Sequence, residues 1–265
     1  MTDVYKPTTQ ESDNISPLKD HFKVSGDQIF ATLQGEGLFP EEGGTAGLPA
    51  IFLRLHFCNL ACSWCDTKYT WDKTRAEFWQ ESENWTIEET AQKLSNLWDQ
   101  TEWEAKFGKT GPKRLVVTGG EPLLQQDKIA QLIKILPGWS IEIETNGTVP
   151  PSDALLSCQI NSSPKLSNSG NLKVLRYKPD VLKRINNWPN SWFKFVVQDE
   201  TDLTEVEEIV KACKLSKDKV LIMPEGYTLD DVKKHAALVA KAVIKHGWRI
   251  GRRNQLTWFG TKRRT

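Results

Sequence analysis

Three cysteines, Cys58, Cys62 and Cys65, lie close together in the stretch RLHFCNLACSWCDTKYTWD, in the pattern CxxxCxxC. Thiolates at this spacing can bind a metal centre, and two kinds of centre are compatible with the pattern. One is a structural zinc site, which needs four ligands and is usually built from two separated pairs. The other is a cubane iron–sulfur cluster, in which three thiolates hold three irons and the fourth iron stays open. Burial of all three cysteines in an apolar core is a weaker interpretation, because the run is polar.

The remaining cysteines favour the cluster over zinc. The chain has five cysteines and no second CxxC pair, although Cys158, Cys213 or His56 could supply a fourth zinc ligand. An odd number of cysteines, three of them clustered, argues against a disulfide framework and predicts a reducing, cytoplasmic setting.

A glycine turn in the segment VVTGGEP (116–122) follows an apolar run and is the second feature that suggests chemistry. Glycine allows the backbone to approach a ligand at distances where any Cβ would collide. Such a turn, taken alone, is also compatible with an ordinary loop. Its position downstream of the cysteines is what makes it informative.

Short apolar runs alternate with amphipathic helical patterns along the chain, which predicts a mainly parallel sheet with helical crossovers. Thr86 is expected to cap the first of the longer helices. Strands are predicted at 50–57, 114–118, 140–145, 158–162, 192–198 and 219–223, and helices at 86–100, 123–136, 202–214 and 228–246. Six strands are too few for a closed eight-stranded barrel, so the pattern favours an open, partial barrel with its chemistry at the carboxyl ends of the strands.

Composition limits the possible partners. Lys and Arg number 35 against 34 Asp and Glu, so bulk charge favours neither nucleic acid nor an anionic membrane. The locally basic segment RRNQLTWFGTKRRT is compatible with a solvated tail or with contact to an anionic substrate. Residues 1–25 are polar, without an apolar signal region, and are predicted to form a flexible N-terminal arm. Residues 26–265 are predicted to form a single domain.

The cysteine run directly after the first predicted strand, with Trp64 before its last cysteine and GGEP downstream, resembles the radical S-adenosylmethionine (SAM) superfamily. The resemblance implies an α/β fold, a partial, open, TIM-like (β/α)6 barrel, with a 4Fe-4S cluster on Cys58, Cys62 and Cys65. It also implies that the open iron binds SAM and that reduction then yields a 5′-deoxyadenosyl radical.

Six motifs in order narrow the resemblance. They are IFATLQGEG (29–37), PAIFLRL (49–55), CNLACSWCDT (58–67), TGGEPLL (118–124), IETNGT (143–148) and SSPK (162–165). Together they resemble the 7-carboxy-7-deazaguanine synthases, which convert 6-carboxy-5,6,7,8-tetrahydropterin to 7-carboxy-7-deazaguanine with loss of ammonia. The resemblance implies a small pterin substrate, an electron donor such as flavodoxin or ferredoxin, and a homodimer, with no nucleic acid and no membrane as partner.

The same resemblance assigns roles to individual residues. The implied substrate-binding residues are Leu33, Gln34, Gly35, Arg54 and Thr118, with Arg54 offering a planar fork to the substrate carboxylate. The implied SAM-binding residues are Trp64, Gly120, Glu121, Ser163, Pro164 and Lys165. Without the motif, Lys165 is equally compatible with a solvated charge. Thr67 is implied as a ligand of Mg²⁺, a cation that prefers oxygen ligands.

Two departures from the family pattern stand out. Phe57 takes the place of a common glycine before the first cysteine, which questions the close packing of the loop. The acidic, aromatic insert at 69–85 could cover the site or meet the reducing partner. Two alternatives remain open at this stage: a glycyl-radical-activating enzyme acting on a protein, and a zinc-stabilised binding module.

Overall fold

The computed structural model describes residues 4–15, 18–107 and 112–262. Backbone contacts divide the chain into two compact units, each assembled from separate stretches of sequence. The first unit comprises Met1–Ala31, Ala50–Glu144 and Ser152–Cys158, and the second comprises Thr32–Pro49, Thr145–Pro151 and Gln159–Thr265.

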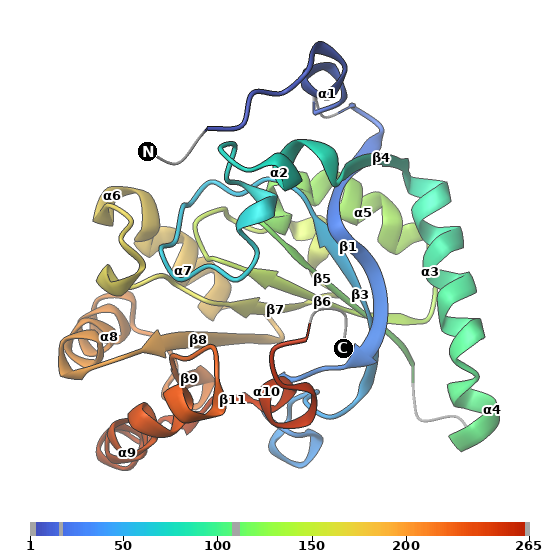
Figure 1. The fold of residues 1–265 in the computed structure, drawn as a ribbon. Coiled ribbons are helices and arrows are strands. Elements are labelled where there is room, and N and C mark those ends of the chain that lie inside the picture. The colour runs from blue at the N-terminus through green and yellow to red at the C-terminus, as the bar shows by residue number, and fades with distance from the viewer. Residues whose placement is uncertain (1–3, 16–17, 108–111, 263–265) are drawn as a thin grey trace. The chain divides into compact units, whose positions relative to one another are not determined.

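The strands of the first unit follow the order β6-β5-β3-β1-β4 (Figure 1). Their bounds are β1 His21–Leu33, β3 Pro49–Leu55, β4 Ser82–Thr86, β5 Lys113–Gly119 and β6 Trp139–Thr145, of which a few terminal residues fall in the second unit. β3, β5 and β6 are parallel, and β4 runs antiparallel to β1. The helical elements are α1 Thr9–Asn14, η2 Lys68–Thr70, α2 Ala76–Gln80, α3 Ile87–Thr101, α4 Trp103–Phe107, η3 Pro122–Gln125, α5 Gln126–Ile135 and η4 Asp153–Leu155.

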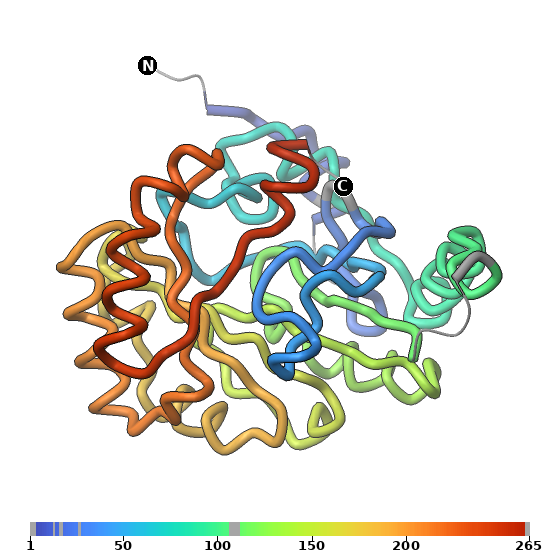
Figure 2. Tube along the Cα trace, turned by 90° about the horizontal axis from the view of Figure 1, so that it is seen from below, coloured from blue at the N-terminus to red at the C-terminus, as the bar shows by residue number. Residues whose placement is uncertain are grey.

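In the second unit, the strands follow the order β10-β9-β8-β7, and a short antiparallel pair, β2 with β11, joins distant segments. The strands are β2 Glu36–Gly37, β7 Gln159–Ser162, β8 Ser191–Val197, β9 Val220–Pro224, β10 Arg249–Ile250 and β11 Arg252–Arg253. The helical elements are η1 Pro40–Glu42, η5 Ser167–Ser169, α6 Lys173–Arg176, α7 Pro179–Asn186, α8 Glu200–Cys213, η6 Lys217–Lys219, α9 Leu229–His246 and α10 Asn254–Phe259. In Figure 2 the blue loop and the red C-terminal segment are the parts of the chain that contain β2 and β11, which pair in the register Arg252↔Gly37 and Arg253↔Glu36.

The parallel strands form because their sequences are nearly continuous apolar runs. Leu115, Val116 and Val117 of β5 are fully buried, and every residue of β9 is buried. Strands buried on both faces are typical of parallel sheets covered by helices. In the second unit, α7 and α8 pack against each other and against β8, while α9 packs against β9 (Figure 1). The sequence prediction of a mainly parallel α/β architecture is therefore confirmed.

All six predicted strands are present, with ends shifted by one or two residues. The four predicted helices correspond to α3, α5, α8 and α9, and Thr86 caps α3 by accepting a hydrogen bond from the Glu89 amide at 3.0 Å. The helix expected from residue 123 begins at Gln126, because Pro122–Gln125 form a 3-10 turn first. Among the described strands, those of neither unit close into a barrel.

β1 and β4 are among the elements that were not predicted. β1 begins at His21, inside the segment expected to be an arm, and pairs with β4 from His21↔Thr86 to Ser25↔Ser82. β4 itself comes from the insert at 69–85, so part of that insert is a strand of the sheet.

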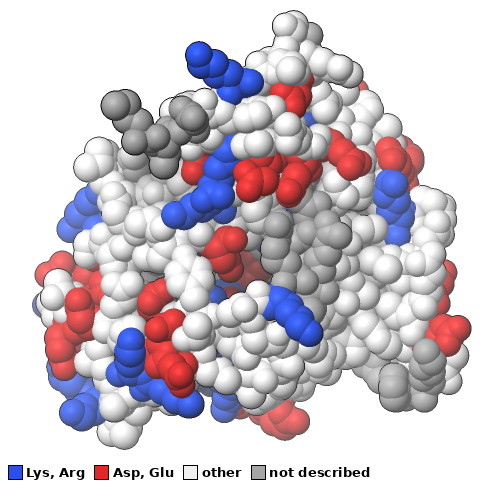
Figure 3. Space-filling model, in the orientation of Figure 1, with Lys and Arg blue, Asp and Glu red and all other residues white. Residues whose placement is uncertain are grey.

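Acidic side chains gather over α2 and β4 on the face that Figure 3 shows. The single-domain assignment for 26–265 stays a prediction.

None of the helices within the described residues combines the length and the apolar composition of a membrane span.

Candidate active site

The cysteine loop starts where β3 ends. Phe57, which precedes Cys58, adopts a left-handed backbone conformation with a φ of 75°. Glycine is the residue that reaches this region without cost, so the replacement of glycine by Phe57 introduces strain of about 1–2 kcal/mol. The loop nevertheless keeps a regular path, because the Phe57 amide donates to the Thr70 carbonyl at 2.9 Å. The close packing questioned from the sequence is thus retained.

The glycine turn after β5 packs against the backbone of this loop. The Gly120 amide donates to the Leu55 carbonyl at 3.0 Å, and the Glu121 amide donates to the Phe57 carbonyl at 2.7 Å. A Cβ on Gly120 would lie 1.9 Å from the Phe57 oxygen, and one on Gly119 would lie 2.0 Å from the Leu55 oxygen. Both glycines are therefore required for contact between two backbone segments, a reason that the sequence analysis did not give.

Two polar side chains lie next to the sulfur of Cys65. The indole nitrogen of Trp71 donates a hydrogen bond to Cys65 Sγ at 3.3 Å, and Thr67 Oγ1 lies 3.5 Å from the same sulfur. Donors of this kind stabilise a thiolate and tune the potential of an iron–sulfur cluster. Trp71 was not among the predicted site residues. Its only sequence signal was its position in the aromatic segment that follows the cysteines.

Burial raises the pKa of the Cys58 thiol to about 12, and the nearby Glu121, Cys62 and Cys65 oppose its ionisation further. Several thiolates cannot coexist here without compensating positive charge. Iron cations supply such charge, so the donor set of this loop fits a cluster held by Cys58, Cys62 and Cys65.

The alternative of a closed zinc site has no support in the geometry. Among the described residues, no group of three or more His, Cys, Asp or Glu side chains is arranged to hold a single metal ion. A four-iron cluster is larger than a single ion and keeps its thiolates farther apart. The lack of a single-ion site among the described residues therefore does not argue against a four-iron cluster. His56 is completely buried, and its ring packs against Phe57 and Phe78.

A buried hydrogen-bond network fixes the start of the loop. Gln125 accepts from the Lys23 amide at 2.8 Å, and it donates to the carbonyls of Lys23 and His56 at 2.9 and 3.1 Å. The His56 amide donates to the Lys23 carbonyl at 2.8 Å. Burial, reinforced by the charge of Lys23, lowers the pKa of His56 to about 3, so this histidine is neutral.

Arg54 and Thr118 are neighbours in the first unit. They are register partners of β3 and β5, one residue before the pair Leu55 and Gly119 that ends the ladder. The Arg54 guanidinium lies over the Phe30 ring, 5.7 Å from its centroid. Within the described residues, its buried Nε has no hydrogen-bond partner. The structure thus brings together two residues predicted to bind substrate.

The other predicted residues of the first unit lie around the same loop. Trp64 and Thr67 are partly exposed, while Glu121 is fully buried and accepts from the Leu123 amide at 3.0 Å. Thr67 is the N-cap residue of η2, yet its hydroxyl makes no capping hydrogen bond there. The Thr67 carbonyl stabilises the turn instead, because it accepts hydrogen bonds from the Thr70 amide at 2.9 Å and from the Thr70 hydroxyl at 2.8 Å.

In the second unit, the predicted segment Leu33–Gly35 is held by backbone contacts. The Gln34 amide donates to the Leu48 carbonyl at 2.9 Å, and the Gln34 carbonyl accepts from the Gly47 amide at 2.8 Å. The Gln34 side chain is 3 % exposed, and its oxygen accepts from the Glu36 amide at 3.2 Å. The side chain of Gln34, one of the residues implied to bind substrate, therefore takes part in shaping its own loop.

The predicted SAM segment Ser163–Lys165 follows β7 in the second unit. The Ser163 amide donates to the Thr145 carbonyl at 2.7 Å, and Lys165 Nζ lies 2.9 Å from Ser163 Oγ. Arg176, which is 5 % exposed, donates to the Lys165 carbonyl at 3.0 Å and forms an ion pair with Glu205. These contacts argue against the interpretation of Lys165 as only a solvated charge.

A family model described as the radical SAM superfamily matches residues 53–236, and the chain therefore belongs to this superfamily. The match covers the cysteine loop, the glycine turn and the later strands. Membership implies a 4Fe-4S cluster and SAM as cofactors, and it confirms the predicted α/β fold of the radical SAM type.

The relatives narrow the family to the 7-carboxy-7-deazaguanine synthases. A protein of that name from Pyrobaculum aerophilum is 32 % identical over 242 residues, which cover 89 % of this chain and 95 % of the relative. Another, from Escherichia coli strain K12, is 31 % identical over a match that covers 84 % of this chain and 92 % of the relative. A third, from Rhodopirellula baltica, is 29 % identical over a match that covers 90 % of this chain and 87 % of the relative.

A solved structure shares the fold. The crystal structure of QueE from Escherichia coli superimposes with a TM-score of 0.60 at 24 % identity, covering 92 % of this chain and 98 % of that one. The open arrangement of strands predicted from the sequence is consistent with this similarity.

Proposed function

We propose that this protein converts 6-carboxy-5,6,7,8-tetrahydropterin to 7-carboxy-7-deazaguanine and ammonia, as part of queuosine or related 7-deazapurine biosynthesis. The substrate and the two products balance in atoms and in oxidation state. Relatives named 7-carboxy-7-deazaguanine synthase, similar along most of the chain, support the assignment.

The observation that carries the proposal is the neighbourhood of Arg54 and Thr118 at the carboxyl ends of β3 and β5. The cysteine loop leaves β3 directly after this pair. A guanidinium whose buried Nε has no partner among the described residues is suited to bind a carboxylate through two parallel hydrogen bonds. We therefore assign the substrate carboxylate to Arg54, with Thr118 beside it. Leu33, Gln34 and Gly35 of the second unit are proposed as substrate-binding residues because the family motif implies that role.

Cys58, Cys62 and Cys65 hold the cluster in this proposal, and Trp71 donates to the Cys65 sulfur. The SAM-binding residues are Trp64, Gly120, Glu121, Ser163, Pro164 and Lys165. When bound, the cluster and SAM together supply the radical that removes a hydrogen atom from the substrate. The protein's part is to orient the substrate and to exclude water from it.

The proposal is tested by anaerobic reconstitution with iron and sulfide, followed by incubation with the tetrahydropterin, SAM and a reductant. We expect 7-carboxy-7-deazaguanine and ammonia in equal amounts, measured by mass spectrometry and an ammonia assay. The matched control is Cys62→Ala in the same assay. Cleavage of SAM without either product would reject the substrate assignment and would favour a protein substrate.

Thr67 is proposed as a ligand of Mg²⁺, because its hydroxyl lies beside the cysteine loop and does not cap η2. We expect Thr67→Ala to need about tenfold more Mg²⁺ for half-maximal rate, since one oxygen ligand is lost. Iron content and SAM cleavage are expected to be unchanged. The measurement is product formation against Mg²⁺ concentration in parallel with iron analysis.

Thr67→Ser is the control for this prediction, because it keeps the oxygen and should match the parent. An unaltered Mg²⁺ dependence in Thr67→Ala would end the ligand assignment. Joint loss of iron and activity would instead assign the hydroxyl to maintenance of the loop.

An electron donor such as flavodoxin or ferredoxin, a homodimer and a cytoplasmic location complete the proposal. All five cysteines lie in the described part of the chain and none forms a disulfide, which supports a reducing compartment.

A further inference from the structure

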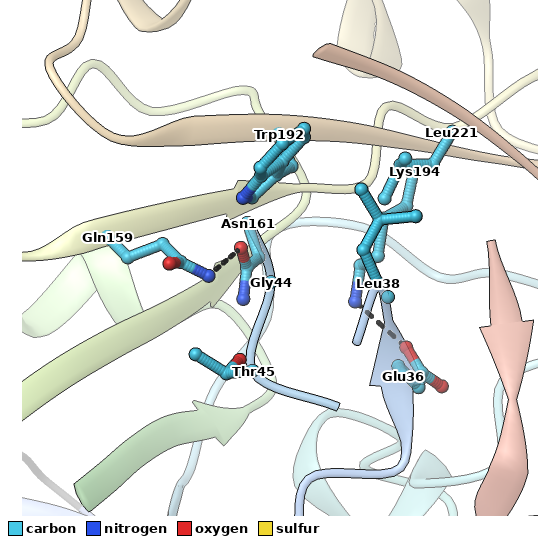
Figure 4. A pocket seen from close by; sticks show the side chains of 10 residues that line it. Glu36, Leu38, Gly44, Thr45, Gln159, Asn161, Trp192, Lys194 and Leu221 are labelled. Carbon is cyan, nitrogen blue, oxygen red and sulfur yellow. Dashed lines mark hydrogen bonds and ion pairs between the residues drawn. The ribbon is translucent and has the colours of Figure 1, made fainter. Parts of the chain in front are cut away.

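The carboxylate of Glu36 is held by side chains from two distant parts of the second unit. Lys194 Nζ on β8 lies 2.8 Å from Glu36 Oε2, and Gln255 Nε2 on α10 donates to Glu36 Oε1 at 3.0 Å. Arg253 Nε lies 3.9 Å from Glu36 Oε1. Figure 4 shows Lys194 and Glu36 reaching toward each other across the pocket that they line.

This contact is a strong one for electrostatic reasons. The Lys194 side chain is only 5 % exposed on the largely apolar strand β8, and the Glu36 carboxylate, whose side chain is 30 % exposed, provides its ammonium with an opposite charge at 2.8 Å. Burial opposes ionisation of Glu36, but the charges of Lys194 and Arg253 outweigh it and hold the pKa of Glu36 at about 2. The Glu36 carboxylate is therefore ionised throughout the neutral range.

The residue before Glu36 is fixed by the same C-terminal segment. The Asn254 amide donates to the Gly35 carbonyl at 2.8 Å, and β2 pairs with β11 in the register Glu36↔Arg253. A Cβ on Gly35 would lie 2.5 Å from Gln255 Oε1, so the side chain of Gln255 rests directly on the Gly35 backbone. Any displacement of Glu36 would be transmitted to the segment Leu33–Gly35.

We infer that Glu36, Lys194 and Gln255 are positioning residues that hold the segment Leu33–Gly35 in the conformation needed to recognise the pterin. This inference rests on the proposed function. Lys194 and Gln255 were not candidates from the sequence; a single lysine in the middle of an apolar strand was the available signal for the first. In this inference Glu36 acts through the segment Leu33–Gly35, which it directly follows.

Loss of these contacts should affect recognition of the tetrahydropterin and leave the cluster-binding loop intact. A displaced Leu33–Gly35 segment weakens recognition of the tetrahydropterin, while the cysteine loop and the glycine turn, which belong to the first unit, keep their own contacts. Misplacement of a binding group by about 1 Å can cost up to about a hundredfold.

The test uses the reconstituted holoenzyme with the variants Lys194→Met and Gln255→Leu. We expect the KM for the tetrahydropterin to rise by about tenfold or more in each variant, with iron content, SAM cleavage without substrate and the KM for SAM unchanged. Amide hydrogen exchange in residues 33–37 should become faster. Gln255→Leu leaves the Lys194–Glu36 ion pair in place and so keeps the test valid if Lys194→Met does not fold.

Arg252→Gln is the matched control. Arg252 lies on the same β11 strand, but it pairs with Glu42 on the surface and stacks over Phe39, away from Gly35. We expect this variant to keep the parental KM for the tetrahydropterin.

Equal changes in both KM values, together with a lowered melting temperature, would assign the three residues to general stability and overturn the inference. An unchanged KM in folded Gln255→Leu and Lys194→Met would overturn it as well. If the parent protein does not turn over the tetrahydropterin at all, the proposed function fails and the inference fails with it, an outcome visible before any variant is compared.

Discussion

Alanine at any one of Cys58, Cys62 or Cys65 is expected to reduce product formation to the level of the unreconstituted protein. Each thiolate would hold one iron, and loss of one ligand leaves a cluster with only two protein thiolates. The visible absorbance of the cluster, together with iron and sulfide content after anaerobic reconstitution, measures this effect. SAM cleavage should disappear in the same variants.

Cys158→Ala and Cys213→Ala are the controls for this result. Cys158 is buried, and Cys213, on α8 of the second unit, packs 3.5 Å from the Tyr177 hydroxyl. Their loss should reduce the free energy of unfolding by about 1–2 kcal/mol and leave iron content unchanged. Loss of the cluster in Cys158→Ala would contradict the three-ligand assignment.

Gly120→Ala is expected to be nearly as damaging. Its Cβ would lie 1.9 Å from the Phe57 carbonyl oxygen and 2.4 Å from the carbonyl carbon, which are backbone atoms that cannot rotate away. The cysteine loop or β5 must therefore move, and the free energy of unfolding should fall by about 3 kcal/mol or more. Thermal melts of the apoprotein and iron content after reconstitution measure the two effects separately.

Gly138→Ala separates this steric effect from conformational strain. Gly138 has a φ of 80°, but nothing lies within 4 Å of the position that its Cβ would take. The free energy of unfolding of Gly138→Ala should fall by only about 1–2 kcal/mol, and its iron content after reconstitution should be unchanged. If Gly120→Ala melted like the parent and bound iron, the close approach of the two backbones would be refuted.

Local patterns were sufficient to predict the parallel strands and the cysteine loop. The run Leu115–Val117 is apolar on both faces, as strands of a covered parallel sheet are, and the cysteine spacing favours an iron–sulfur cluster over a zinc site. The same sequence did not predict β1, because it contains a buried lysine, Lys23, which interrupts the apolar pattern. Burial lowers the pKa of Lys23 to about 8, although Glu83 partly opposes the shift.

The ion pairs of the C-terminal segment could not be predicted from the sequence for a different reason. The sequence left the basic C-terminal segment as either a solvated tail or a contact for an anionic substrate. Instead, Arg252 pairs with Glu42, while Arg253 lies near Glu36 and donates to the Gly226 carbonyl. Residues 263–265 of that segment lie outside the described part of the chain. Such pairs have no local periodicity, so only the folded chain reveals them.

The contacts of Glu36 also have a consequence for the order of folding. During synthesis, Glu36 leaves the ribosome 158 residues before Lys194 and 219 residues before Gln255. Contacts across such long stretches carry a large loop-closure cost and form after local elements. The carboxylate must therefore stay hydrated while most of the chain is still being made. A nascent chain can acquire its cysteine loop and glycine turn well before its Leu33–Gly35 segment reaches its final conformation.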